Sequence, residues 1–307
     1  MLDLANPIYT DAAKAREHLE SVRWPHGPFC PHCGEAVEIR RLKGKSHRAG
    51  LCQCKSCRKQ FTVTVGTVFE RSKVPLNKWL LANHLICASK KGVSAHQLHR
   101  MLGVTYKTAW FMAHRIREAM REHKDFEGPL GGENQVVEAD ETYVGGKSKN
   151  RAFKEPPKKE AVVSLVERDG RVRSRHVPSV TSKSLRPILV QQIDRKSYLM
   201  TDESGVYIRT GGEFAGHGTV NHSIDQYVRK GGFEHTNTVE NYFSILKRGV
   251  VGTFHHVSQQ HLKRYVGEFD FRYNARKMTD AERADIALRG IEGKRLTYRR
   301  IDKAGHV

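Results

Sequence analysis

The fold of this chain is decided by the stretch Val136-Val137-Glu138-Ala139-Asp140-Glu141-Thr142-Tyr143-Val144. The run is typical of a β-strand, in which successive side chains point to opposite faces of a sheet. Glu138, Asp140 and Thr142 then share one face, and positions 137, 139 and 143 share the other. The stretch therefore predicts a strand that carries acidic side chains on one face and apolar side chains on the other.

Strands and helices follow this stretch in an alternating order. The sequence predicts further strands at 161–167, 172–180 and 198–201, and helices at about 182–193, 236–248 and 258–275. Asp169-Gly170 separates two of these strands and is typical of a hairpin turn. This order predicts an α/β domain with a mixed sheet and helices on its faces. It is compatible with a ribonuclease-H-like fold, and other α/β or α+β arrangements fit it too.

A second acidic residue ends another of the predicted strands. Asp202 follows the run Tyr198-Leu199-Met200-Thr201 directly. Carboxylates on or just after adjacent strands can share divalent ions, and Mg²⁺ favours one or two carboxylates together with substrate phosphates. Asp140 and Asp202 are therefore candidate ligands of a divalent ion.

The predicted helix at 236–248 carries a polar stripe. At 100° per residue, one side of this helix gathers Asn237, Glu240, Ser244 and Lys247. Such a stripe would direct Glu240 toward the two aspartates and Lys247 toward a phosphate. An ordinary solvated face explains the same pattern, so the stripe alone leaves its role open.

Four cysteines have the spacing of a metal site. Cys30 and Cys33 form one C-x2-C pair, and Cys54 and Cys57 form a second after a twenty-residue spacer. Two intervening residues let both thiolates of a pair reach one tetrahedral ion. Four thiolates leave no open position, so the sequence predicts one structural Zn²⁺.

The two other cysteines are not expected to bind the metal. Cys52 lies too close to Cys54 to join its C-x2-C pair, so we expect a free thiol. Cys87 lies in an apolar helical pattern and is expected in a core. His32 is an alternative ligand only if one cysteine of the set fails.

A helix-turn-helix is predicted after the cysteine region. Ser94-Ala95-His96-Gln97 has the form of a capping box, Gly103 is a natural helix stop, and Thr105 can cap a second helix that runs to about Glu122. Two short helices with a glycine-containing turn form a common DNA-reading unit. The second helix would present Tyr106, Lys107 and Thr108 to base edges. A helical hairpin that only packs is the alternative.

The charge of the chain points to a polyanionic partner. Lys and Arg number 53 against 33 Asp and Glu, a formal net charge of +20, which favours nucleic acid over an anionic membrane surface. No apolar run approaches the ~20 residues of a membrane-spanning helix, and the N-terminal residues lack a signal-peptide pattern. We therefore expect a cytoplasmic, nucleoid-associated protein with no membrane partner.

Together these residues resemble bacterial insertion-sequence transposases of the zinc-ribbon-carrying DDE branch. The similar motifs, in collinear order over about residues 20–277, are the cysteine pairs, Gln60-Phe61-Thr62, Gly66–Phe69, Lys91–Ser94, Val137–Lys147, His235–Glu240 with Lys247-Arg248-Gly249, His261-Leu262 and Phe271–Asn274. The resemblance implies a ribonuclease-H-like catalytic domain that holds two Mg²⁺ ions, for which Mn²⁺ can substitute.

The resemblance also implies roles for single residues. Asp140 and Asp202 would be the first two magnesium ligands. The third ligand in this branch is Asn or Glu, and both Asn237 and Glu240 are present. On electrostatic grounds we expect Glu240 as the ligand and Asn237 as a residue that positions water or DNA. Lys247, with Arg248 beside it, would contact the DNA end.

We therefore expect a DNA transposase. It would bind terminal inverted repeats, cleave the ends and join the 3′-hydroxyls to target DNA by two-metal phosphoryl transfer, as a homodimer or a larger synaptic assembly. The expected domains are an N-terminal helix with the zinc ribbon (8–66), a helix-turn-helix (70–125), the catalytic domain (130–275) and a basic tail (276–307). The alternatives are a DNA-binding regulator with an inactive core, and a ribonuclease-H-like nuclease without strand transfer.

Overall fold

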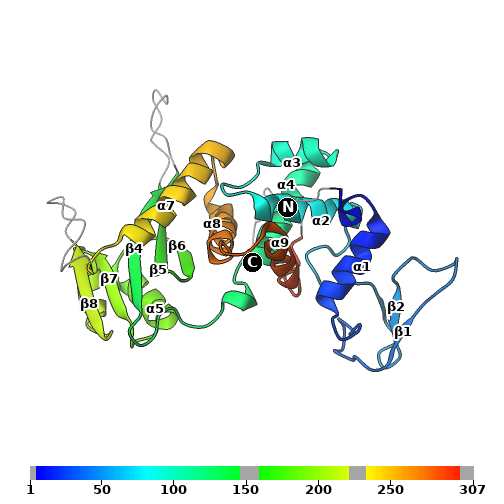
Figure 1. Cartoon of the computed structure of the whole chain (residues 1–307), viewed down its shortest axis with the longest axis horizontal. Coiled ribbons are helices and arrows are strands. Elements are labelled where there is room, and N and C mark those ends of the chain that lie inside the picture. The colour runs from blue at the N-terminus through cyan, green and yellow to red at the C-terminus, as the bar shows by residue number, and fades with distance from the viewer. Residues whose placement is uncertain (1–4, 146–158, 221–232, 298–307) are drawn as a thin grey trace, which may run out of the picture. The chain divides into compact units, whose positions relative to one another are not determined.

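The computed structural model describes residues 5–145, 159–220 and 233–297, drawn as helices and strands in Figure 1. These residues form two compact units. The first contains the chain up to His123 together with the segment from Met278 onward, and the second contains Lys124–Lys277. Within the described ranges, no helix is both long and apolar enough to cross a membrane.

The first unit is built on helices that come from both ends of the chain. Its helices are α1 (Ala12–Arg23), α2 (Leu76–Ala88), α3 (Ala95–Leu102), α4 (Tyr106–Met120) and α9 (Asp280–Arg289), with a short 3-10 turn before α1. Buried Asn83 of α2 donates to the carbonyl of Ala284 in α9 at 2.8 Å. His18 of α1 contacts Asp285 of α9 at 2.8 Å. The segment that we expected as a basic tail therefore supplies α9 to the first unit.

Local capping explains the two helices of the predicted helix-turn-helix. The Ser94 hydroxyl accepts from the backbone N–H of Gln97 at the start of α3. Gly103 ends α3 in the left-handed region at φ 59°, which favours glycine. Thr105 then caps α4 by accepting from the N–H of Thr108 at 3.2 Å. Both helices thus begin at the predicted residues.

A small antiparallel sheet holds the cysteine region. Its strands β1 (Ile39–Arg41), β2 (Cys52–Cys54) and β3 (Gln60–Phe61) lie in the order β1-β2-β3. Cys52 is fully buried on β2, opposite Arg41 and Phe61, so its thiol faces the interior of this region.

The second unit contains a mixed five-stranded sheet in the order β6-β5-β4-β7-β8 (Figure 1). The strands are β4 (Val136–Val144), β5 (Glu160–Glu167), β6 (Val172–Val177), β7 (Tyr198–Asp202) and β8 (Gly216–Val220). β4, β5 and β6 form an antiparallel meander, whereas β7 and β8 run parallel to β4. This arrangement confirms the prediction of a ribonuclease-H-like domain with a mixed sheet. Strand β8 and helix α6 (Gly205–Gly211) of this domain were not predicted from the sequence.

Helices cover both faces of this sheet. α5 (Ser182–Gln192) and α6 pack on the face that carries Val137 and Ala139. α7 (Asn237–Gly249) and α8 (Gln259–Asn274) pack on the face that carries Val162 and Val166. Because side chains alternate along β4, Asp140 lies on the face that α7 covers.

Helix α8 closes the outer edge of the sheet. The Asn274 amide pairs with both backbone groups of Val172 on β6, at 2.7 and 3.0 Å. The Asp270 carboxylate accepts from the N–H of Ser174 at 2.8 Å. These contacts satisfy backbone groups that an exposed edge strand would offer to another chain.

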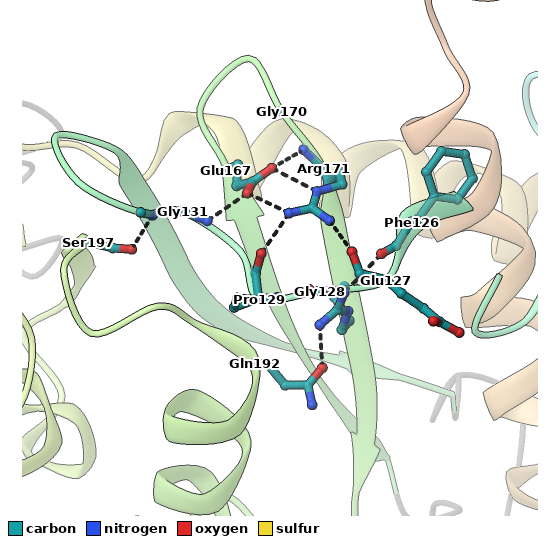
Figure 2. Close-up of polar contacts among 12 residues, drawn as sticks. Phe126, Glu127, Gly128, Pro129, Gly131, Glu167, Gly170, Arg171, Gln192 and Ser197 are labelled. Carbon is teal, nitrogen blue, oxygen red and sulfur yellow. Dashed lines mark hydrogen bonds and ion pairs between the residues drawn. The ribbon is translucent and has the colours of Figure 1, made fainter. Parts of the chain in front are cut away.

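The glycine-rich segment 128–132 is bound to the β5–β6 hairpin. Arg171 donates to the carbonyls of Glu127 and Pro129 at 2.7 Å each (Figure 2). The Glu167 carboxylate accepts from the N–H of Gly131 at 2.6 Å and pairs with Arg171. Side chains of the hairpin therefore fix the position of this segment within the second unit.

Gly131→Ala is expected to destabilise the second unit more than Gly128→Ala does. Both glycines have positive φ, 78° and 89°, so each alanine costs about 1–2 kcal/mol in backbone strain. A Cβ at Gly131 would also lie 2.1 Å from the Ser197 hydroxyl, whereas Gly128 has open space. The overlap adds about 1–3 kcal/mol. Urea unfolding of the full chain measures the difference in the free energy of unfolding. Equal losses of stability in the two variants would contradict the close packing of Gly131 against Ser197.

Candidate functional site

The structure brings Asp140 and Asp202 to neighbouring parallel strands. β4 and β7 pair in a register that sets Val137 opposite Leu199 and Glu138 opposite Met200. Continued by two residues, this register sets Asp140 opposite Asp202. Asp202 is the last residue of β7, and Asp140, at the middle of the longer β4, lies level with it. The carboxyl end of β7 is the edge at which α/β sheets gather their ligand-binding groups.

Asp140 is partly buried and lies in a negatively charged environment. Burial raises the pKa of its carboxyl to about 7 and outweighs the hydrogen bond from the Glu141 N–H at 2.7 Å, which lowers it. The charges of Glu141, Asp202 and Glu240 raise the pKa further. An oxygen donor set with this excess of negative charge fits a divalent cation such as Mg²⁺.

Helix α7 supplies Glu240 to this acidic group. Glu240 is partly buried, and its carboxylate accepts from the Thr236 hydroxyl at 3.3 Å. It is close enough to Asp140 to affect the pKa of that carboxyl. Asn237 is exposed at the first residue of the helix. Glu240 and Asn237 are the two candidates for a third ligand. Of these, Glu240 is the one whose charge affects Asp140.

The basic residues predicted to bind DNA lie at the other end of α7. Lys247 and Arg248 are exposed in its last turn, and Arg248 donates to the Ser244 carbonyl at 3.1 Å. Lys247 follows Glu240 by seven positions in the helix, which corresponds to about 10 Å along the axis. Acidic and basic groups are thus separated along one helix.

Two further acidic residues of β4 had no role in the sequence analysis. Glu141 points away from α7, and its carboxylate accepts from the Tyr207 hydroxyl of α6 at 2.5 Å. Glu138 is fully buried beside the start of α7. The signal for both was present: a strand with three acids within four residues has to bury or pair some of them.

Among the described residues, one group alone has three or more potential metal-ligating atoms within 4.8 Å of one another. It consists of Cys30, Cys33, Cys54 and Cys57. The Sγ atoms of Cys30 and Cys57 lie 3.6 Å apart, as do those of Cys33 and Cys54. Tetrahedral Zn–S bonds of ~2.3 Å set S–S distances of ~3.8 Å, so the four thiols fit one Zn²⁺ ion. The carboxylates of Asp140, Asp202 and Glu240 are more widely spaced than this group.

Backbone groups around the cysteines also suit thiolate ligands. The N–H of Cys57 donates to the sulfur of Cys54 at 3.5 Å and lowers the pKa of that thiol to about 7. The N–H of His32 donates a hydrogen bond to the sulfur of Cys30 at 3.4 Å. Glu35 accepts from the Ser56 hydroxyl at 3.1 Å, which joins the two cysteine pairs. His32 and Cys52 stay outside the four-cysteine group.

The predicted DNA-reading residues lie at the start of α4. Tyr106 and Lys107 are exposed, and the Tyr106 ring stacks on His96 of α3 with ring centroids 4.3 Å apart. Thr108 is partly buried, and its hydroxyl pairs with that of Thr105 at 2.9 Å. Tyr106 and Lys107 are thus accessible to a partner, whereas Thr108 also takes part in the helix cap.

Two family models match the chain. An ISXO2-like transposase domain matches residues 129–274, and a transposase zinc-ribbon domain matches residues 10–60. The chain thus combines a transposase zinc-ribbon domain with an ISXO2-like transposase domain. The first match contains the acidic site, and the second contains the four cysteines. This family assignment confirms the resemblance found in the sequence.

A relative from an archaeon spans most of the chain. It is an uncharacterized protein in the transposable element ISH50 of Halobacterium salinarum, 28% identical over 292 residues, and the match covers 86% of this chain and 91% of the relative.

Two solved structures show weaker similarity. One is the simian T-cell lymphotropic virus intasome in complex with the PP2A regulatory subunit B56 gamma, with a TM-score of 0.29, 16% identity, and coverage of 56% of this chain and 63% of that chain. The other is the Mos1 transposase paired-end complex with the left transposon end, with a TM-score of 0.28, 11% identity, and coverage of 64% and 70%. TM-scores of this size do not establish a common fold.

Cys54→Ser is expected to release about one equivalent of zinc, because a tetrahedral site needs all four thiolates. The ribbon should loosen while the second unit stays folded. Cys52→Ser is the matched control, since Cys52 lies two residues away and outside the metal group. Zinc content after gel filtration, with circular dichroism of the full chain, measures the effect. Full zinc retention in Cys54→Ser would rule out the site.

Proposed function

We propose that this chain is a DNA transposase that binds the terminal inverted repeats of its mobile element, cleaves the ends and joins the freed 3′-hydroxyls to target DNA. The observation that carries the proposal is that Asp202 and Glu240 lie close enough to Asp140 to raise its pKa. All three residues lie within the region that the transposase domain model matches. Phosphoryl transfer between DNA strands needs carboxylates that hold divalent ions next to a phosphate.

The residues divide the work at this site. Asp140 and Asp202, from adjacent strands, and Glu240, from α7, would hold two Mg²⁺ ions. Such ions supply the positive charge that activates water and stabilises the leaving 3′-oxygen. Lys247 and Arg248 would bind phosphates of the same DNA strand, since they are exposed about 10 Å along α7. Asn237, exposed at the start of α7, would orient water or DNA.

The electrostatic contact with Asp140 supports Glu240 as the third ligand. A carboxylate brings a full negative charge that the amide of Asn237 lacks, and Mg²⁺ prefers charged oxygen ligands. Asn237 is the first residue of α7, where a polar side chain can reach a bound phosphate or water.

Recognition of the element ends is assigned to the first unit. Tyr106 and Lys107 are exposed at the start of the second of two helices joined by a short turn, where helix-turn-helix proteins place their base-reading side chains. The zinc ribbon would add a second contact surface. Because two ends have to be cut together, we infer a homodimer or a larger assembly on DNA.

The test is incubation of the purified chain with the DNA that flanks its own gene, a supercoiled target plasmid and Mg²⁺ or Mn²⁺. The expected products are nicked or cut ends and end–plasmid joints that map to the 3′-hydroxyls. Cleavage without joints would instead identify a nuclease. Binding without any cleavage would identify a regulator with an inactive core.

Glu240→Gln is expected to lose Mg²⁺-dependent cleavage more severely than Asn237→Ala, because it removes a ligand charge. Mn²⁺, a divalent ion that also suits carboxylate ligands, is expected to rescue part of the activity. Asp140→Asn serves as the reference, since it should bind end DNA at least as well as the wild type and not cleave. Cleavage rates in each metal measure the order. The reverse order would move the third ligand to Asn237.

Lys107→Ala is expected to weaken binding to the specific end DNA by about 1–3 kcal/mol if Lys107 reads a base edge. Binding to random DNA should change little. Lys183→Ala is the control, because it removes the same charge from an exposed position on α5 of the second unit. Fluorescence anisotropy at fixed salt gives both affinities. An equal loss on random DNA would make Lys107 a phosphate contact only.

A further inference from the structure

Glu138 occupies an unusual position for a charged residue. Its side chain is fully buried on β4, two residues before Asp140 and on the same face. A buried carboxylate is stable only when its oxygens are hydrogen-bonded or paired with positive charge. The contacts of Glu138 therefore show which groups compensate its buried charge.

The first set of contacts is with the start of α7. One carboxylate oxygen of Glu138 accepts from the backbone N–H groups of Thr238 and Val239, at 2.8 and 3.0 Å. The other oxygen accepts from the Thr238 hydroxyl at 2.9 Å. The residue at the N-cap position, Thr236, makes no capping hydrogen bond with its own side chain. Glu138 thus caps α7 from a neighbouring strand, at the end of the helix that favours negative charge.

The second set of contacts is with the β5–β6 hairpin. Arg168 pairs with Glu138 through Nε at 2.8 Å. The same guanidinium donates to the carbonyls of Phe233 and His235, at 2.7 and 2.9 Å. His235 Nδ1 lies 3.1 Å from the Glu138 carboxylate. The strand, the hairpin and the residues that lead into α7 therefore meet at one charged centre.

These contacts leave Glu138 no free oxygen with which to bind a metal ion, although it shares the face of Asp140. We propose that Glu138, with Arg168, is a positioning residue that sets the distance between Glu240 and Asp140. Glu138 and Asp140 are one strand repeat apart, about 7 Å. Val239, which Glu138 binds, directly precedes Glu240. The hydrogen bonds of Glu138 to the start of α7 thus determine the distance between Asp140 and Glu240.

The inference rests on the proposed function, because a positioning role requires a metal site to position. Residues that hold metal ligands in place typically change metal affinity or activity by about 10–100-fold when they are mutated. Loss of Glu138 should therefore weaken metal binding, and not only the stability of the second unit.

The test compares Glu138→Gln with Glu167→Gln. Glu167 is a matched control in the same unit, since it also accepts from backbone N–H groups and pairs with an arginine, but it holds residue 131 and the hairpin instead of α7. Mn²⁺ binding to the full chain is measured by electron paramagnetic resonance, and Asp140→Asn defines the part of the binding that belongs to the acidic site. Thermal unfolding without added metal measures stability.

Both glutamine variants should lower the unfolding temperature, and only Glu138→Gln should weaken the Asp140-dependent Mn²⁺ binding, by about tenfold or more. The Mn²⁺ concentration needed for half-maximal cleavage should rise in parallel. If Glu138→Gln does not fold, Thr238 gives the same comparison. Thr238→Val removes the hydroxyl that donates to the Glu138 carboxylate and leaves the two backbone N–H donors and Arg168 in place. Thr238→Ser keeps this hydroxyl. Only Thr238→Val should therefore weaken Mn²⁺ binding.

Two results would overturn the inference, and they are distinguishable. Equal Mn²⁺ affinities for Glu138→Gln and Glu167→Gln, with Asp140-dependent binding intact, would limit Glu138 to a structural role. Equal Mn²⁺ binding by the wild type and Asp140→Asn would remove the metal site itself, and with it both the proposed function and the positioning role.

Discussion

The buried carboxylate of Glu138 is the interaction on which the arrangement of the acidic site depends. It lies within the central strand of the sheet, and it accepts hydrogen bonds from the first turn of α7 and from Arg168. An uncompensated charge at this depth would cost several kcal/mol, so the helix and the hairpin have to stay in place around it. The apolar contacts of α7 with β5 and α8 hold the rest of the helix. Directional hydrogen bonds thus set where α7 begins, and hydrophobic packing keeps it on the sheet.

The site collects negative charge in a chain that is strongly positive. The formal net charge is +20, yet Glu141, Asp202 and Glu240 all lie close enough to Asp140 to raise the pKa of its carboxyl. Burial, and then the neighbouring negative charges, raise the pKa of Asp140 to about 7, which disfavours its ionised form, and a bound cation would oppose that effect. A DNA substrate would face the opposite problem, because its phosphates need positive charge. Under the proposed function, Lys247 and Arg248, exposed about 10 Å along α7 from Glu240, would supply that charge.

The second unit and the cysteine region reach stability by different means. The second unit has apolar clusters on both faces of a five-stranded sheet. The cysteine region has strands of only two or three residues, and sheets of that size do not hold together without help. Four thiolates around one Zn²⁺ provide a cross-link between its two ends, since a structural zinc site contributes folding energy directly.

The sequence by itself determined the features that depend on neighbouring residues. The cysteine spacing, the caps at Ser94 and Thr105 and the period-2 pattern of 136–144 each act over a few residues, and the structure has a corresponding element at each of them. The order of strands and helices was enough to predict the mixed sheet. Strand β8 was missed because Gly216-His217-Gly218 has little strand propensity, and it pairs only because β7 provides a neighbour.

Only the tertiary structure decided which polar groups meet. Glu138 and Thr238 are 100 residues apart in the chain, and no local pattern indicates that one caps the helix of the other. The polar stripe of α7 was equally compatible with a solvated face until the packing of α7 on β4 brought Glu240 near Asp140. The C-terminal residues were predicted to be a charged tail, because α9 contains many charged residues and buries only a few side chains, such as Ala284 and Leu288. Long-range contacts of this kind depend on the packing of whole elements, which a short stretch of sequence does not contain.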